Sequence, residues 1–252
     1  MSTVTFAQHG AIAKITLNRP DKLNAFSAEL VHDLTQAISK AVSSGARLAL
    51  FQAEGKGFSG GFDLSSIEQE TDGDLVLRFI QIEQMLQAVY HAPLATMAIV
   101  HGACYGAAAD LVAACQWRVA TSDARFRIPG PRFGLALGTR RLAELVGEDR
   151  YRQLVLRTKP FDAAEALCAG VITDIAGQEE WESITQNVLA EVSALNPLTF
   201  TRISSQLRRE MKDADLAELV HEPLFSCARV LQACLRQQVL LPGLLHFLVL
   251  QF

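Results

Sequence analysis

Two short apolar runs, separated by a segment of helical periodicity, constrain the fold of this chain more than any other feature. The runs are 47–52 (RLALFQ) and 94–100 (LATMAIV), and glycine or proline bounds each of them. Short continuous apolar runs are typical of strands buried on both faces of a parallel sheet. The intervening residues 74–90 are expected to form a helix. This order of elements predicts an α/β fold with a partly parallel sheet.

The residues before this unit predict a strand hairpin and a helix. Residues 11–17 alternate between apolar and polar side chains, and a turn at His9 and Gly10 precedes them. This pattern predicts an opening hairpin. Ser27 is expected to cap an amphipathic helix that ends before Gly45.

The residues after this unit continue the α/β order. An Ala-rich helix is expected over 106–115 and a short strand over 117–120. Helices are expected to dominate after Arg140. Strands followed by helices in this way suggest α/β layering in one large domain or two small ones.

Composition excludes several classes of function. The chain has 252 residues, and 50% of them are hydrophobic, which is enough to fill a sizeable core. Its 23 basic and 27 acidic side chains give a net charge of −4 and form no basic cluster, so nucleic-acid binding is not expected. The five cysteines lack the spacing of a disulfide framework or a zinc site, so no metal is expected.

Neither end of the chain predicts a membrane segment. Residues 1–10 lack the positive and apolar regions of a secretory signal, so a cytoplasmic protein is expected. The apolar stretch 239–250 is shorter than the ~20 residues that a spanning helix needs. Pro242 and Gly243 also interrupt it, so no membrane span is expected.

A glycine-rich segment at 55–61 (GKGFSGG) fits two known patterns by its letters. As GxGxxG it could bind a pyrophosphate, but a helix must then begin within the segment, and 62–74 is a poor helix. As GxSxG it could place Ser59 at the nucleophile elbow of a serine hydrolase. That mechanism requires a tight strand-to-helix turn and an acid–histidine pair, neither of which is evident in the sequence.

Four motifs in order give this segment a third interpretation. They are 15–25 (ITLNRPDKLNA), 57–64 (GFSGGFDL), 101–107 (HGACYGA) and 163–171 (AAEALCAGV). Together they resemble the crotonase superfamily of enoyl-CoA hydratases and isomerases, over about residues 6–171. The resemblance implies an α/β fold, a crotonase-type spiral of ββα units with a helical C-terminal region.

The same resemblance divides the chain into two regions. Residues 1–190 would form a crotonase-like core that binds acyl-CoA, and residues 191–252 a helical trimerisation region. Because relatives assemble as trimers, a homotrimer or a dimer of trimers is implied. Coenzyme A would enter as part of the acyl-CoA thioester substrate, and no separate cofactor is implied.

Two backbone amides bind the thioester oxygen in the crotonase superfamily, and the motifs place them at Phe62 and Ala107. Fixed amide dipoles stabilise an enolate or oxyanion strongly, and a helix N-terminus adds its macrodipole. The backbone must then approach the ligand closely, which the resemblance assigns to Gly60, Gly61 and Gly106.

The resemblance also places the coenzyme A portion of the substrate. Its adenine end would lie by the turn that precedes the first long helix and by the backbone near the glycine-rich segment. The residues implied in these contacts are Lys22, Leu23, Ala25, Ser59, Asp63 and Leu64.

The resemblance places Asp110 and Gly130 at the positions of the two catalytic glutamates of hydratases. Asp110 lies three residues after Ala107 on the same expected helix, in the apolar setting AAADLVAAC, where a carboxylate needs a partner or a function. Gly130 offers no carboxylate, and hydration uses such groups to hold and deprotonate water. An ordinary fast hydratase is therefore disfavoured. The segment 134–142 is also shorter than in typical relatives, which implies a different pocket wall.

The sequence therefore predicts an acyl-CoA enzyme of the enoyl-CoA hydratase/isomerase type, with Asp110 as the candidate proton carrier. Hydration, isomerisation, thioester hydrolysis and decarboxylation stay open, because one oxyanion hole serves many chemistries. A catalytically depleted acyl-CoA-binding homologue is the main alternative, and a serine hydrolase that uses Ser59 is the third. Further candidates to bind a carboxylate or phosphate of the ligand are Arg127, Arg132, Arg140 and Arg141.

Overall fold

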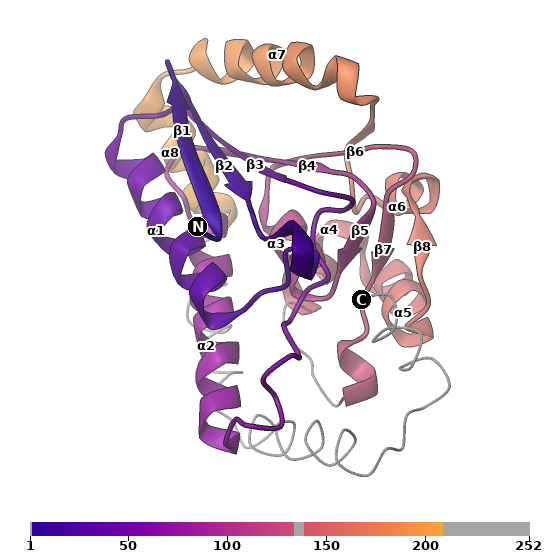
Figure 1. Cartoon of the computed structure of the whole chain (residues 1–252). Helices are drawn as coiled ribbons and strands as arrows, with labels where there is room; N and C mark the ends of the chain where they lie inside the picture. The colour runs from indigo at the N-terminus through magenta and orange to yellow at the C-terminus, as the bar shows by residue number, and fades with distance from the viewer. Residues whose placement is uncertain (1, 134–138, 209–252) are drawn as a thin grey trace.

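A six-stranded sheet forms the frame of the protein. The computed structural model describes residues 2–133 and 139–208. The strands lie in the order β1-β2-β3-β4-β6-β9, and Figure 1 labels β1, β2, β3, β4 and β6 along the sheet. β1 is antiparallel to β2, and the other neighbouring pairs are parallel, so the expected hairpin and partly parallel sheet are confirmed. The bounds are β1 (Val4–His9), β2 (Ile12–Leu17), β3 (Leu48–Ala53), β4 (Ala95–Val100), β6 (Trp117–Ala120) and β9 (Asp174–Ile175).

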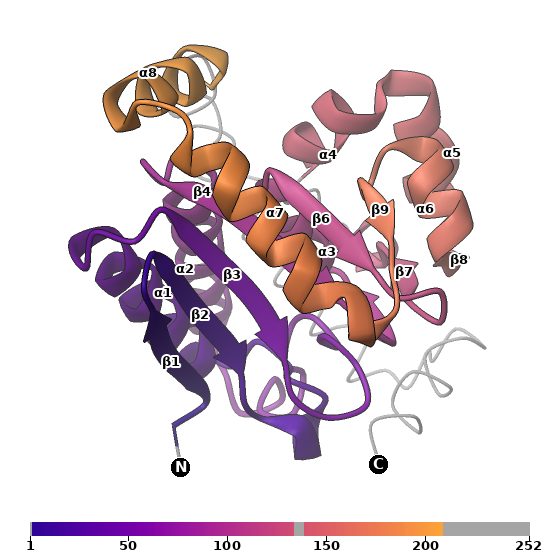
Figure 2. The ribbon, with the colours of Figure 1, turned by 90° about the horizontal axis from the view of Figure 1, so that it is seen from above.

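Helices cover both faces of this sheet, which explains why its central strands are apolar throughout. Alternate side chains of a strand point to opposite faces. Leu50 therefore packs in the apolar cluster on one face, and Phe51 in the cluster on the other. Figure 2 shows α7 across one face, with α1 and α2 on the opposite side. These helices are α1 (Ala28–Ser43), α2 (Asp72–Tyr90) and α7 (Trp181–Ser193).

The helix starts follow from local capping. The Ser27 hydroxyl accepts a hydrogen bond from the Leu30 amide at 3.2 Å, which confirms the expected cap of α1. α2 begins two residues earlier than the periodicity predicted, because Thr71 and Asp74 form a capping box. In it the Asp74 amide donates to the Thr71 hydroxyl at 3.2 Å, and the Thr71 amide to the Asp74 carboxylate at 2.9 Å.

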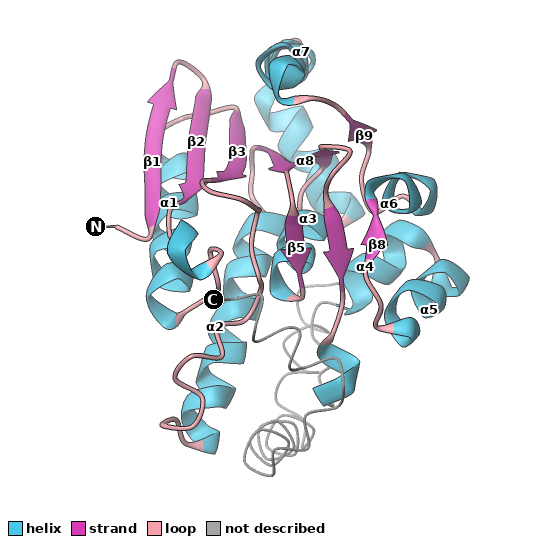
Figure 3. Cartoon of the chain, turned by 45° about the vertical axis from the view of Figure 1, so that its right-hand side comes forward, coloured by secondary structure: helices cyan, strands magenta, loops and turns pink. Residues whose placement is uncertain are grey.

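A second sheet of three strands turns the chain into a spiral. β4 continues directly into β5 (Ala103–Tyr105), which leads into α3 (Ala107–Ala114). β6 continues likewise into β7 (Arg125–Arg127), which is parallel to β5 and antiparallel to β8 (Phe161–Asp162). Figure 3 shows this smaller sheet beside the main one. Each turn thus adds one strand to each sheet, and the α/β fold with a spiral of ββα units is confirmed.

Helices dominate after Arg140, as expected, although β8 and β9 were not predicted because two-residue strands carry no periodicity. The boundary expected at 190 falls inside α7, and residues 209–252, most of the expected trimerisation region, lie outside the described residues. Within the described ranges, no helix combines the length and apolarity needed to cross a bilayer. The remaining elements are η1 (Pro20–Lys22), η2 (Gly130–Phe133), α4 (Thr139–Val146), α5 (Glu148–Arg157), α6 (Ala163–Ala169), η3 (Gln178–Glu180) and α8 (Pro197–Leu207).

Gly102 and Gly10 form a matched pair that tests how closely the chain packs between the two sheets. Their φ angles are +53° and +57°, but a β-carbon on Gly102 would lie 2.3 Å from the Lys56 carbonyl oxygen, whereas Gly10 faces open space. We expect Gly10→Ala to lower the free energy of unfolding by about 1 kcal/mol through backbone strain. Gly102→Ala should lose ~2 kcal/mol more, because a backbone atom must move. Urea unfolding measures both losses, and equal values would contradict the close approach.

Candidate functional site

The segment after β3 runs alongside β5 and brings two turns together. Ser59 forms a parallel bridge with β5. The Ser59 amide donates to the Ala103 carbonyl at 2.9 Å, and the Tyr105 amide donates to the Ser59 carbonyl at 3.0 Å. This register sets the turn at 60–62 against the turn at 105–107, where α3 begins.

Gly61 is the point where the two turns touch. Its φ is +86°, and a β-carbon there would lie 2.3 Å from the Tyr105 carbonyl oxygen and 3.6 Å from the Ala107 nitrogen. Only glycine accepts both this φ and this contact. The peptide that joins Gly61 to Phe62 therefore lies next to the N-terminus of α3.

The amides of Phe62 and Ala107 have no acceptor within the described part of the chain. The Phe26 amide donates to the Gly61 carbonyl at 2.6 Å, and the Asp63 amide donates to the Phe26 carbonyl at 3.3 Å. In such a parallel bridge the middle residue directs its own N–H away from the partner. Ala107 is the first residue of α3, and the first amides of a helix have no intrahelical acceptor. Two free donors thus stand at the residues that the resemblance implied.

Gly130 lies close to the same turn. The Gly106 amide donates to the Arg127 carbonyl at 2.8 Å, and a β-carbon on Gly106 would contact the Pro129 ring at 3.7 Å. Gly130 follows as the first residue of η2 and is half-buried. The fold therefore brings this position to the Gly106 turn, but with no carboxylate to offer. Residues 134–138 of the segment expected to form a different pocket wall lie outside the described residues.

The turn implied in binding adenine lies against the glycine-rich segment. The Gly60 amide donates to the Leu23 carbonyl at 2.8 Å. Asn24 is fully buried with a φ of +50°, and its amide group donates to three carbonyls within 54–58. Lys22 is exposed and Leu23 half-buried, so both are accessible, and their contact with a ligand stays a prediction.

Asp63 is held in place by the chain itself. Its carboxylate forms an ion pair with Arg19 and accepts a hydrogen bond from the Ser65 amide at 2.9 Å. Burial raises the pKa of Asp63, but the hydrogen bonds from Ser65 and Arg19 outweigh it and keep this pKa below its usual value. Arg19 also donates to the Ala25 carbonyl at 3.2 Å, so it links the two regions implied in CoA binding. Leu64 is half-buried, and Ala25 is buried.

Ser59 has a structural set of contacts. Its hydroxyl is fully buried, donates to the Asn24 carbonyl at 2.7 Å and accepts from the Gly61 amide at 3.1 Å. Among the described residues, no histidine bonds to it. The next helix begins only at Asp72, so neither a nucleophile elbow nor a pyrophosphate-binding turn has the helix it requires.

Asp110 is a buried carboxyl group near the two free amides. It lies three residues after Ala107 on α3, hence on the same side of the helix, and is 8% exposed. Burial raises the pKa of Asp110 to about 7, while the Arg141 guanidinium lowers this pKa and the Glu83 carboxylate raises it. The group is therefore divided between its two protonation states near neutral pH, as suits a proton carrier.

A buried ion pair between α2 and α4 stands close enough to Asp110 to influence its pKa. Arg141 donates to Glu83 through both terminal nitrogens, with an Nη1–Oε1 distance of 2.8 Å. The Gln87 amide group donates to the same Oε1 at 3.2 Å. Sequence reasoning missed Glu83 and Gln87. Both residues interrupt the apolar face of α2, and this interruption could have identified them in the sequence, because buried polar groups need partners.

The other candidate ligand-binding arginines bond within the chain. Arg127 and Arg132 both donate to Thr158, at 3.0 Å to its carbonyl and 2.6 Å to its hydroxyl. Arg140 lies 3.6 Å from Glu144. No group of three or more His, Cys, Asp or Glu side chains suited to a metal ion occurs in the described ranges.

Comparisons with known proteins agree on one family. A family model described as Enoyl-CoA hydratase/isomerase matches residues 7–225. A protein named probable enoyl-CoA hydratase in Mycobacterium tuberculosis is 31% identical over 245 residues, 94% of each chain. The crystal structure of a Bordetella parapertussis protein assigned to the enoyl-CoA hydratase/isomerases is 37% identical with a TM-score of 0.88, covering 95% of this chain and 99% of that one. An enoyl-CoA hydratase from Bacillus halodurans, 23% identical with a TM-score of 0.85 over 94% and 100% of the two chains, shares the fold.

Asp110→Asn tests the protonation of this carboxyl through stability. Because folding raises the pKa of Asp110 from its ordinary value of 3.8 to about 7, the folded chain binds more protons between these values. The stabilisation is therefore full at low pH and lost as pH rises through 7. Relative to Asp110→Asn, the wild type should lose about 1.4 kcal/mol of unfolding free energy per unit of pKa shift between pH 4 and 8. Urea unfolding across this range measures it, and parallel curves would show an unshifted carboxyl.

Proposed function

This chain belongs to the enoyl-CoA hydratase/isomerase family of the crotonase superfamily, and from that membership we propose that it binds an acyl-CoA thioester between the amides of Phe62 and Ala107. The observation that carries the proposal is the pair of donors, without acceptors among the described residues, at the contact of Gly61 with the start of α3. A thioester carbonyl oxygen would accept a hydrogen bond from each of the two amides.

The two donors favour a negatively charged oxygen over a neutral carbonyl. They are backbone groups fixed by the sheet register and the helix start, so they need no reorganisation as charge develops. The macrodipole of α3 adds positive potential at Ala107. Removing one such donor typically costs about 3 kcal/mol of transition-state stabilisation. An enolate or oxyanion of the thioester is therefore the species this site stabilises best.

Proton transfer beside the thioester carbonyl is the chemistry that one carboxyl group can carry. Asp110, with a pKa of about 7, can take a proton from one carbon and return it to another while the amides hold the enolate. Hydration needs a further group to activate water, and Gly130 has none. Glu83 does not replace it, because Arg141 and Gln87 bind its carboxylate. We therefore place isomerisation before hydration.

Two other functions remain as alternatives. The absence of a carboxylate at Gly130 favours a catalytically depleted homologue that binds acyl-CoA without turning it over. The serine hydrolase ranks below it, because the Ser59 hydroxyl is buried and engaged with Asn24 and Gly61. Assays of acyl-CoA turnover test the depleted homologue, and labelling of Ser59 by a serine-directed probe tests the serine hydrolase.

The proposal extends to assembly as a homotrimer or a dimer of trimers, with 191–252 as the contact region. The described start of this region supports it, because large apolar side chains there are 49–79% exposed. Several large exposed apolar side chains within one short segment are consistent with a surface that another protein chain covers. The side chains are Leu195, Leu198, Ile203 and Leu207.

Binding of acyl-CoA is the first expected outcome. A ligand that binds only the folded state at a hundred times its Kd stabilises it by about 2.7 kcal/mol. We expect crotonyl-CoA and longer acyl-CoAs to raise the thermal unfolding midpoint more than free coenzyme A does, measured by calorimetry. Unchanged midpoints at saturating concentrations of all of them would reject the proposal. Labelling of Ser59 by a fluorophosphonate would support the serine hydrolase.

Asp110→Asn separates catalysis from binding. Asn is nearly isosteric with Asp but cannot accept the proton, so turnover of the active acyl-CoA should fall roughly 10²-fold or more. The acyl-CoA should still bind and raise the unfolding midpoint. Double-bond migration and hydration of enoyl-CoAs are followed separately by chromatography of the products. Normal turnover by the variant would remove Asp110 from the mechanism, and no turnover by the wild type would favour the depleted homologue.

A further inference from the structure

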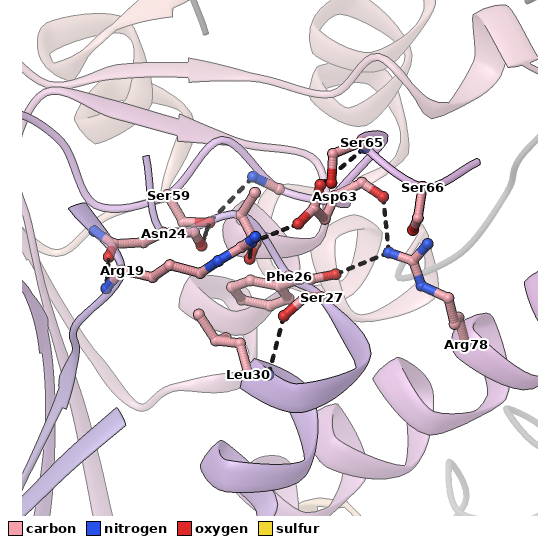
Figure 4. Close-up of polar contacts among 12 residues, drawn as sticks. Arg19, Asn24, Phe26, Ser27, Leu30, Ser59, Asp63, Ser65, Ser66 and Arg78 are labelled. Carbon is pink, nitrogen blue, oxygen red and sulfur yellow. Dashed lines mark hydrogen bonds and ion pairs between the residues drawn. The ribbon is translucent and has the colours of Figure 1, made fainter. Parts of the chain in front are cut away.

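We propose that Arg78 positions the Phe62 amide, so that the thioester oxygen meets a donor of fixed direction; this inference rests on the function proposed above. Arg78 belongs to α2 and is 7% exposed. Its guanidinium reaches from that helix to Phe26 and Asp63, as Figure 4 shows. No sequence motif marks this residue, which lies fifteen positions after Asp63 and outside the glycine-rich segment.

One nitrogen of Arg78 links the two segments of the chain that contain Phe26 and Asp63. Its Nη2 donates to the Asp63 carbonyl at 2.7 Å and to the Phe26 carbonyl at 3.2 Å. Phe26 is the bridge partner of Phe62. Asp63 is the residue after Phe62, and its carbonyl lies in the peptide that joins Asp63 to Leu64. The same NH₂ group therefore restrains the residue opposite the donor and the residue after it.

The guanidinium also contacts the Phe62 side chain. The Cζ atom of Arg78 lies 3.9 Å from the centroid of the Phe62 ring, within the range of a cation–π contact. The ring of Phe79, the next residue of α2, has its centroid 4.9 Å from that of Phe62. Arg78 and Phe79 of α2 thus both contact the Phe62 ring, and Arg78 also binds the carbonyl of the next residue, Asp63.

Arg78 is itself fixed by a carboxylate. Its Nη1 donates to both oxygens of Glu70, at 2.7 and 2.9 Å. The hydroxyl of Ser66, which Figure 4 shows beside Arg78, donates to the same carboxylate. On the other side of the turn, Arg19 pairs with the Asp63 carboxylate. Asp63, the residue after Phe62, is therefore bound through its carbonyl by Arg78 and through its carboxylate by Arg19.

The unfavourable free energy of burying the Arg78 cation indicates that this residue does more than fill space. Burying a cation is unfavourable even when it is paired, and Arg78 Nε is buried without an acceptor among the described residues. A hydrocarbon side chain would fill the same volume without that cost. Only a guanidinium offers planar donors toward two carbonyls and a carboxylate at once, which lysine cannot reproduce. Oxyanion donors need such placement, to within about 0.5 Å.

The test measures the polarisation of a bound thioester in the full-length protein. The probe is 4-dimethylaminocinnamoyl-CoA, whose absorption moves to longer wavelength when its carbonyl oxygen accepts hydrogen bonds. We expect Arg78→Lys to bind it with a Kd within about threefold of wild type but to lose most of the red shift. Turnover of the active acyl-CoA should fall about 10-fold, with little change in KM. Ala107→Pro removes the second donor at a helix position that tolerates proline, so its red shift shows the effect of losing one hydrogen bond. Ala107→Gly, which keeps the amide, is its control.

Glu70→Gln gives a second route if Arg78→Lys does not fold. It removes the charge that anchors Arg78 but leaves every contact to the turn possible, and we expect a smaller red shift from it than from wild type. A full red shift in Glu70→Gln and in any folded Arg78→Lys would overturn this inference alone and leave the oxyanion hole intact. A wild type that binds the probe with no red shift would overturn the proposed function and this inference with it.

Discussion

The backbone contact between Gly61 and the Tyr105–Ala107 turn is the constraint on which the rest of the site depends. A side chain at Gly61 would meet a carbonyl oxygen at 2.3 Å, so the two turns can approach only through glycine. The contact is possible because Ser59 and β5 share a hydrogen-bonded register. The hydrogen-bonded register of the backbone thus determines where the two amides stand.

Buried polar groups keep this contact in register. Asn24 satisfies three carbonyls of the segment 54–58 from a left-handed backbone position, and the Ser59 hydroxyl joins the Asn24 carbonyl to the Gly61 amide. Buried groups of this kind are unfavourable unless every partner is present, so they specify one arrangement of the loops. Arg19 and Arg78 extend the same logic to Asp63. The segment 55–61, whose sequence fits a phosphate-binding loop or a nucleophile elbow, therefore adopts a different geometry.

Sequence reasoning could predict the parts that rest on local patterns. β3 and β4 followed from continuous apolar runs, and α1 from its cap and periodicity. β5 and β7 did not, because three-residue strands form only where the spiral brings them together. Phe62, Ala107 and Asp110 could be proposed because they sit within or near motifs, and their roles stay predictions. Glu83 and Arg78 were missed, since their partners lie 58 and 15 or 52 positions away in the chain.

In the proposed site, the two backbone amides cannot titrate, whereas the carboxyl group of Asp110 can. The amides of Phe62 and Ala107 offer the same hydrogen bonds at any pH, so they suit every reaction that places negative charge on a thioester oxygen. Asp110 responds to its surroundings, because burial, Arg141 and Glu83 act on its pKa in different directions. In the function proposed above, the choice between reactions would be made by the groups at Asp110 and Gly130. Under the same proposal, a glycine at the second position would leave proton transfer available and take away the group that directs water, which is why we place isomerisation before hydration.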